Sequence, residues 1–200
     1  MDTHAFSHLT PIGFLQTFVL ELMQLCEASV GSQAEDIIER IAQSASRFFE
    51  EAYREEHGLA GTLSQERYAD LIIGLKNHIG GHFAPVSVDA GRIEVVSSRC
   101  PFGDGVRHSP ELCRMTSSVF GGIAARNFGY ARVELRERIA LGHPRCSVVI
   151  HLEPAAALAH EGIDYRGQDK AARREPEAVT LQSRIDERLH ALWCQAKPCR

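Results

Sequence analysis

The hydrophobic period of this 200-residue chain changes near Pro85, and that change restricts the fold. Before it, apolar residues recur at the three-and-four spacing of α-helices. After it, two segments alternate apolar and polar residues as half-exposed strands do. Such a pattern is typical of an α+β protein rather than of a regular α/β repeat. We therefore expect an α+β fold, in which N-terminal helices are followed by helices packed on a small antiparallel β-sheet.

Three helices are predicted before any clear strand. The first, over residues 11–27, has apolar residues both inside and outside one helical stripe, so we expect it to pack against its own domain or against another subunit. A capping box at Ser32 and Glu35 predicts the start of the second helix. A cap at Thr62 or Ser64 predicts the third, which a glycine pair should end.

The central block should read strand, loop, helix, strand, strand. Residues 93–99 predict a short strand that enters a turn-rich loop over 100–105. Ser109 followed by Pro and Glu is a strong helix start, and the helix should reach about residue 126. Residues 132–141 and 146–152 then predict two strands that pair with each other.

We expect three parts along the chain. Residues 1–30 form an N-terminal amphipathic helix suited to dimerisation, and residues 31–158 form the α+β domain. Residues 159–200 read as a charged linker followed by a short helix over 179–193. Two of the six cysteines, Cys194 and Cys199, lie on this tail, where free surface thiols are the simplest interpretation.

Composition excludes several classes of protein. A net charge of −4 and a small excess of acidic residues are unlike a dedicated nucleic-acid binder, so no direct nucleic-acid binding is expected. No signal peptide or membrane-spanning segment is evident, which predicts a cytoplasmic protein with free, metal-bound or redox-active cysteines. The chain also lacks the common hydrolase, nucleotide-binding and metalloprotease motifs, so we expect no enzyme activity.

Three cysteines lie at predicted transitions between elements. Cys100 ends a strand, Cys113 falls in the first turn of a helix, and Cys146 begins a strand. Ligands at element ends can converge without burying charge in the core, and thiolates suit zinc or iron–sulfur centres. The helix dipole is expected to favour the thiolate form of Cys113.

The order of these motifs resembles a known family. Cys100-Pro-Phe-Gly, Ser109-Pro-Glu-Leu-Cys113, Phe120-Gly-Gly122 and Ala140-Leu-Gly-His-Pro-Arg-Cys146 are similar to the methanogen output domain, a sensory module related to vinyl-4-reductase domains. They are also similar to the effector half of the iron–sulfur repressors of the Suf system. The resemblance covers about residues 30–152. It implies a ligand- or cluster-sensing regulatory domain in which Cys100, Cys113 and Cys146 are the cofactor ligands.

The chain departs from the Suf repressors at two points. Those repressors carry a winged DNA-binding domain ahead of this region, and no segment of this sequence reads as one. They also place a further cysteine between the second and last motif cysteines, whereas residues 114–145 contain none. A cluster would then need a fourth ligand from elsewhere, such as Cys26, His82, His108 or His151, or an exchangeable small molecule. His108 is preferred because it shares the loop of Cys100. Zinc held by three cysteines and a histidine is therefore a rival to an iron–sulfur cluster, with haem on Cys100-Pro101 a weaker alternative.

The expected function is regulatory sensing. A change at the metal centre would pass through helix 11–27 or 179–193 to a partner, with a homodimer and a regulatory protein as the expected partners. Two other interpretations stay open. One is a small-molecule-binding signalling module in which the cysteines are structural. The other is a cysteine-dependent enzyme with Cys113 as its nucleophile.

Overall fold

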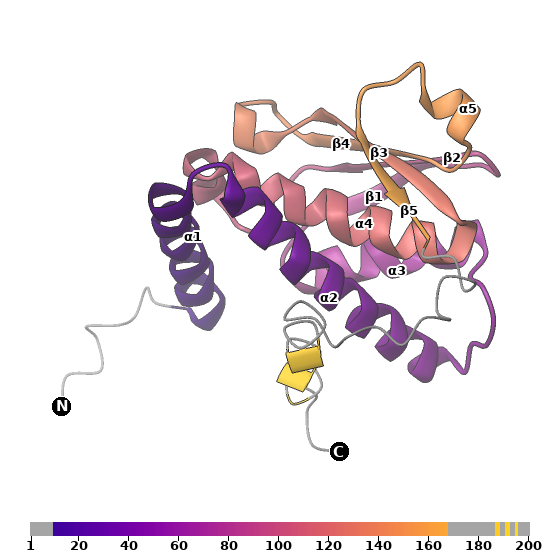
Figure 1. Ribbon diagram of the computed structural model, residues 1–200, viewed down its shortest axis with the longest axis horizontal. Coiled ribbons are helices and arrows are strands. Elements are labelled where there is room, and N and C mark those ends of the chain that lie inside the picture. Colours follow the sequence, from indigo (N-terminus) through magenta and orange to yellow (C-terminus); the bar gives the residue numbers. More distant parts are fainter. Residues whose placement is uncertain (1–9, 168–186, 189–190, 193–194, 196–200) are drawn as a thin grey trace, which may run out of the picture.

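The computed structural model describes residues 10–167, 187–188, 191–192 and 195, and it confirms the α+β fold (Figure 1). The helices are α1 (Pro11–Val30), α2 (Gln33–His57), α3 (Gln65–His78), α4 (Cys113–Phe128) and the short α5 (Pro154–Ala157). The strands are β1 (Phe83–Val88), β2 (Arg92–Ser97), β3 (Tyr130–Glu137), β4 (Cys146–His151) and β5 (Ile163–Arg166). Three 3-10 helices are η2 (Asp104–His108), η3 (Pro110–Leu112) and η4 (Ile139–Leu141). Within these ranges no helix is both long and apolar enough to cross a membrane.

The five strands form one antiparallel sheet in the order β1-β2-β4-β3-β5. Alternate residues of the three central strands point toward the helices, as the period of two requires. These residues are buried in the main core: Ile93, Val95, Val133, Val148 and Ile150. In Figure 1, α3 and α4 lie against this face, α2 packs outside α4, and α5 lies on the opposite side of the sheet.

α4 lies unusually close to both of its neighbours. A Cβ atom added at Gly121 would overlap the ring of Tyr165 on β5, and one at Gly122 would overlap the side-chain amide of Gln43 on α2. The Tyr165 hydroxyl also lies 2.9 Å from the hydroxyl of Ser117 on α4. The two glycines therefore allow α4 to fit between the sheet and α2.

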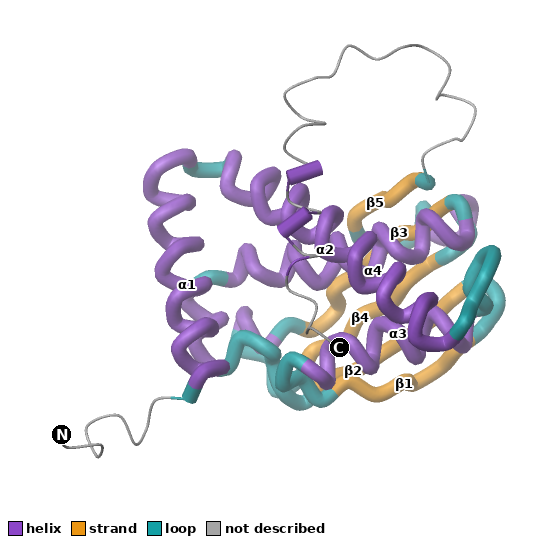
Figure 2. Tube along the Cα trace, turned by 90° about the horizontal axis from the view of Figure 1, so that it is seen from below, coloured by secondary structure: helices purple, strands orange, loops and turns teal. Residues whose placement is uncertain are grey.

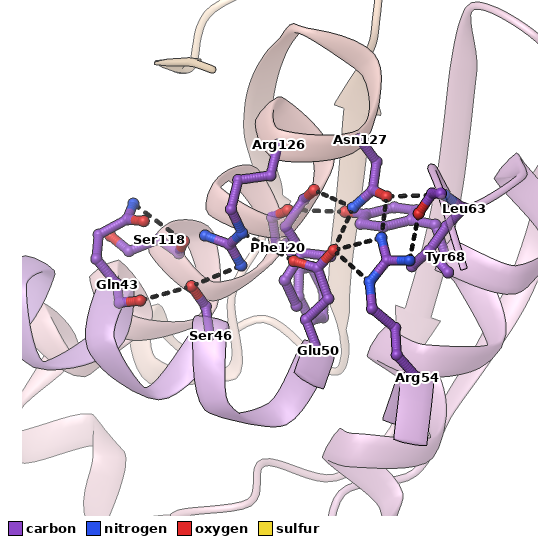
Figure 3. A network of polar contacts seen from close by, with 12 residues as sticks. Gln43, Ser46, Glu50, Arg54, Leu63, Tyr68, Ser118, Phe120, Arg126 and Asn127 are labelled. Atoms are coloured by element: carbon purple, nitrogen blue, oxygen red, sulfur yellow. Dashed lines mark hydrogen bonds and ion pairs between the residues drawn. The ribbon is translucent and has the colours of Figure 1, made fainter. Parts of the chain in front are cut away.

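A buried carboxylate joins α2 to α4 (Figure 3). Glu50 Oε1 accepts hydrogen bonds from Arg54 Nη2 at 2.8 Å and from Asn127 Nδ2 at 2.7 Å, and Oε2 accepts one from Arg126 Nε at 2.8 Å. Asn127 Oδ1 in turn accepts the backbone N–H of Leu63 at 2.8 Å. Two of these donors are positively charged guanidinium groups and the third is an amide N–H. The Glu50 charge is therefore compensated although only 6% of the residue is exposed.

α1 lies at one end of the molecule beside the start of α2 (Figures 1 and 2). Its inner face, with Val19, Leu20 and Met23, packs on a second hydrophobic cluster that includes Val106 and Leu112. Its other face is exposed and apolar. That face consists of Ile12, Phe14, Leu15, Phe18, Leu22 and Leu25, each at least 50% exposed.

Two predicted helix caps are wrong. Ser32 has helical backbone angles and makes no capping hydrogen bond, because only Gly31 and Ser32 separate α1 from α2. Ser109 does not cap α4, since one turn of 3-10 helix, η3, comes first and α4 begins at Cys113. By contrast, Ser64 caps α3 as expected, accepting a hydrogen bond from the backbone N–H of Arg67.

Two edge strands were not predicted. β1 contains Pro85 and a register shift between Pro85 and Ser87, so its alternation is broken. β5 lies within the segment 159–200 that we interpreted as a linker from its charges, yet it pairs with β3 over four residues. Edge strands face solvent on one side and carry more polar residues, which hides them in a sequence pattern. The helix expected over 179–193 lies mostly outside the described residues.

The Glu50 network predicts a large stability effect. Glu50→Ala removes the carboxylate that two arginines and Asn127 share and leaves the two guanidinium charges without their counter-ion, so the free energy of unfolding should fall by about 3–5 kcal/mol in urea denaturation. Glu56→Ala, at an exposed position of the same helix, is the matched control and should change it by less than about 0.5 kcal/mol. Equal effects of the two substitutions would contradict a stabilising role for the network.

Candidate functional site

The three predicted cysteines converge on one pocket. Residue Ser97 at the end of β2 pairs with Cys146 at the start of β4, so the loop that begins with Cys100 lies beside Cys146. The first residue of α4, Cys113, reaches the same end of the sheet. All three side chains line a cavity of about 30 Å³. The other lining residues are Phe83, Pro101, Phe102, Val106, Leu112, Thr116, Leu135, Glu137, Arg138 and Val148.

Backbone amides approach two of the sulfur atoms. The N–H of Ile139 donates to Cys146 Sγ at 3.5 Å, and the N–H of Phe102 donates to Cys100. Such bonds stabilise negative charge on sulfur and orient the side chain. The three sulfur atoms do not all lie within 4.8 Å of one another. Among the described residues, three metal-binding side chains come that close only at another place in the fold.

The thiols are held in their neutral form. Burial, together with the neighbouring Cys146 and Cys100, raises the pKa of Cys113 to about 11. Burial also raises the pKa values of Cys100 and Cys146. The prediction that the helix dipole favours the thiolate form of Cys113 is therefore wrong for the protein without a bound metal, because desolvation outweighs the dipole.

A buried lysine lies beside the cysteines. Lys76 on α3 is 2% exposed, its Nζ donates to Thr116 Oγ1 at 3.0 Å, and it lies 5.7 Å from the centre of the Phe120 ring. Burial lowers its pKa to about 8, while Cys100, Cys113 and Cys146 act in the opposite direction. No carboxylate among the described residues forms an ion pair with it.

Sequence reasoning missed Lys76, although a signal was present. Tyr68, Ile72 and Lys76 follow one another at intervals of four, so the lysine continues the buried stripe of α3. A charge on such a stripe requires a compensating partner or a function. Here Lys76 contacts the Thr116 hydroxyl and the Phe120 ring, and the three thiols are near enough to raise its pKa when they ionise.

The candidate fourth ligands lie in different places. His108 and His82 are exposed, and neither lines the cysteine pocket. His151 points to the opposite face of the sheet from Cys146, as the alternation of β4 predicted. Cys26 on α1 is partly buried and packs on the hydrophobic cluster that Cys100, Cys113 and Cys146 also contact.

α1 contacts the loop that carries Cys100. Gln16 Nε2 donates a hydrogen bond to the backbone carbonyl of Pro101, and the side chain of Leu20 lies directly against Gly105. A displacement of this loop must therefore move α1 or break these contacts.

The sequence of this region matches a model of a protein family, Methanogen output domain 1, over residues 18–151. The chain belongs to this family. The match spans both the pocket cysteines and most of α1, and it agrees with the resemblance inferred from the cysteine, proline and glycine motifs. The similarity to the Suf repressors stays a prediction.

Two solved structures share the fold of this family member. The first is the phenol-responsive sensory domain of the transcription activator PoxR with phenol, with a TM-score of 0.54 and 20% identity over 72% of this chain and 75% of that chain. The second is trafficking protein particle complex subunit 3 from Naegleria fowleri, covalently bound to palmitic acid. Its TM-score is 0.50 and its identity 13%, over 71% of this chain and 95% of that chain. No curated protein matches the chain.

The raised pKa of Cys113 predicts slow alkylation of the metal-free protein. At pH 7.5 its thiolate fraction should be roughly two orders of magnitude below that of a free cysteine, and iodoacetamide labelling should slow accordingly. Peptide mass spectrometry measures the rate at Cys113, and the same protein in guanidinium chloride is the control. Labelling faster in the folded than in the unfolded protein would instead identify an activated nucleophile.

Proposed function

We propose that this protein is a regulatory sensory domain in which Cys100, Cys113 and Cys146 hold an iron–sulfur centre or a zinc ion. Family membership and the sensory domain among its structural neighbours support a sensory role. The metal centre is proposed from the pocket itself, where three thiols from three elements surround one cavity beside Lys76.

The buried charge of Lys76 is the observation that carries the proposal. Three thiolates around a zinc ion, or around a doubly charged iron–sulfur core, leave a single negative charge. The ammonium of Lys76 compensates that charge, whereas three neutral thiols leave a buried cation without an anion. An iron–sulfur centre would supply sensitivity to redox state or iron loss, and zinc would supply a structural site that thiol oxidation opens.

α1 is the proposed output element. Gln16 and Leu20 contact the loop that follows Cys100, so binding at the pocket fixes the loop and with it the inner face of α1. The outer face of α1 gathers six large apolar residues that are each at least 50% exposed, and such a concentration of exposed apolar side chains is typical of an interaction site. We infer that a second copy of the chain covers it and that the dimer presents the signal to a regulatory protein partner.

A small-molecule sensor is the second candidate. Its support is the mainly apolar wall of the pocket and the PoxR domain, which has the same fold and is solved with phenol. The cavity of about 30 Å³ is far smaller than the about 150 Å³ of an apolar cavity that admits benzene, so it accepts a zinc ion as it stands, whereas an iron–sulfur core or a phenol-sized molecule would require the pocket to widen. A cysteine enzyme has less support, because the described pocket lining contains no histidine to act as a base.

Metal analysis after anaerobic purification tests the proposal. The protein should carry iron with sulfide, or zinc, and Cys100→Ser, Cys113→Ser and Cys146→Ser should each remove most of it. A double variant with Cys194→Ser and Cys199→Ser is the matched control and should retain the metal. Neither iron nor zinc, with all three thiols titratable once the protein is unfolded, would contradict the metal centre; phenol binding that survives Cys100→Ser would then favour the small-molecule sensor.

Lys76→Met separates charge compensation from a structural role. It removes a buried cation, so the metal-free protein should be unchanged or more stable, by up to about 4 kcal/mol. Metal affinity should nevertheless fall about 10–100-fold, as when an outer partner of a metal site is lost. Stability and affinity falling together would show that the lysine acts only through packing.

The dimer is tested on α1. Leu15→Glu with Leu22→Glu places two charges on the apolar face and should convert the dimer to a monomer in sedimentation equilibrium. Gln24→Glu adds a charge at an exposed position on the other side of the same helix and should leave the dimer intact. A wild-type protein that sediments as a monomer would overturn the second copy as the covering partner.

A further inference from the structure

A second cluster of metal-binding side chains lies on the sheet face turned away from α4. It comprises Glu134 on β3, His151 on β4 and His160, which follows α5 in the chain. His151 Nε2 is 2.9 Å from Glu134 Oε2, and His160 Nδ1 is 3.7 Å from the same oxygen. The three ligand atoms all lie within 4.8 Å of one another.

These distances match the spacing of ligand atoms around one ion. Bonds of about 2.1 Å place neighbouring ligand atoms about 3.0 Å apart in an octahedron and about 3.4 Å apart in a tetrahedron. The separations of 2.9 Å and 3.7 Å bracket these values. Two imidazoles and one carboxylate are also the donor set that binds divalent iron and related ions while leaving open positions.

The surroundings hold the ligands in place. The second carboxylate oxygen of Glu134 accepts Arg136 Nε at 3.0 Å, which leaves Oε2 directed to the histidines. Arg132 Nη1 donates to the backbone carbonyl of His160 at 3.0 Å and so ties the segment after α5 to the sheet. Arg132 is itself held by the Asp164 carboxylate at 2.7 Å. Carboxylates hydrogen-bonded on their outer oxygen are typical of metal sites.

We propose that Glu134, His151 and His160 bind a divalent first-row transition-metal ion at a site separate from the cysteine pocket. Glu134 and His151 are the fixed ligands, because His151 is 3% exposed and already bonded to the carboxylate. His160 is the adjustable ligand. Its ring stacks on His151 with centres 4.3 Å apart, so it rotates out of the stack when its in-plane lone pair meets the ion.

This placement gives the ion a structural effect. It joins two central strands of the sheet to the segment between α5 and β5, which Arg132 also ties to the sheet. Binding should therefore raise the thermal stability of the folded chain, since the three ligands meet only when this segment is in place.

Titration with Co²⁺ tests the site on the full-length protein. Thiolate-bound cobalt gives an intense near-ultraviolet charge-transfer band, whereas a site of nitrogen and oxygen ligands gives only weak visible bands. We expect one equivalent of Co²⁺ to bind without producing the thiolate band, and to raise the melting temperature. The Cys100→Ser variant should bind this equivalent too. Glu134→Gln and His160→Ala should weaken its binding at least about tenfold.

His57→Ala, at an exposed histidine on the end of α2, is the matched control and should bind cobalt like the wild type. The side chain of His160 is 39% exposed, so its replacement should leave the fold intact, which circular dichroism can verify. Wild-type binding only with the thiolate band, or affinity unchanged in both Glu134→Gln and His160→Ala, would overturn the site. Neither outcome bears on the metal content of the cysteine pocket.

Discussion

The structure depends on the absence of two side chains from the middle of α4. Gly121 and Gly122 let the helix lie against Tyr165 on one side and Gln43 on the other, so that it belongs to two layers at once. The position of α4 then fixes Cys113 at its first residue and Thr116 one turn later. Thr116 in turn holds Lys76 on α3. The close approach of three elements is therefore the condition for the cysteine pocket.

Two buried charged residues, Glu50 and Lys76, differ in how well their surroundings compensate their charge. Glu50 lies among two arginines and an amide, so it is fully compensated and serves to join helices. Lys76 has a hydroxyl and an aromatic ring, which leave most of its desolvation uncompensated. A buried positive charge of this kind is stabilised when a negatively charged group lies nearby. The adjacent thiols can supply that negative charge by losing their protons.

Sequence patterns predicted the parts of the fold that have a strong period. The long helices and the strands β2, β3 and β4 follow from their apolar spacing, and the positions of Cys100, Cys113 and Cys146 at element ends predicted their shared pocket. The edge strands were missed because Pro85 and the charges of β5 weaken the alternation. Contacts between distant segments, such as Lys76 with Thr116 or His160 with Glu134, are set by packing and have no local signal.

The connection between α1 and α2 consists of Gly31 and Ser32 alone. Gly31 has a φ of 56°, a conformation that suits glycine, and a Cβ atom added there would meet no other atom within 4 Å. α1, at 20 residues, is about 30 Å long. A rotation of roughly 10° about this joint therefore moves the far end of the helix by about 5 Å. In the output role that we propose for α1, this length would turn a small change in the loop after Cys100 into a large displacement at the molecular surface.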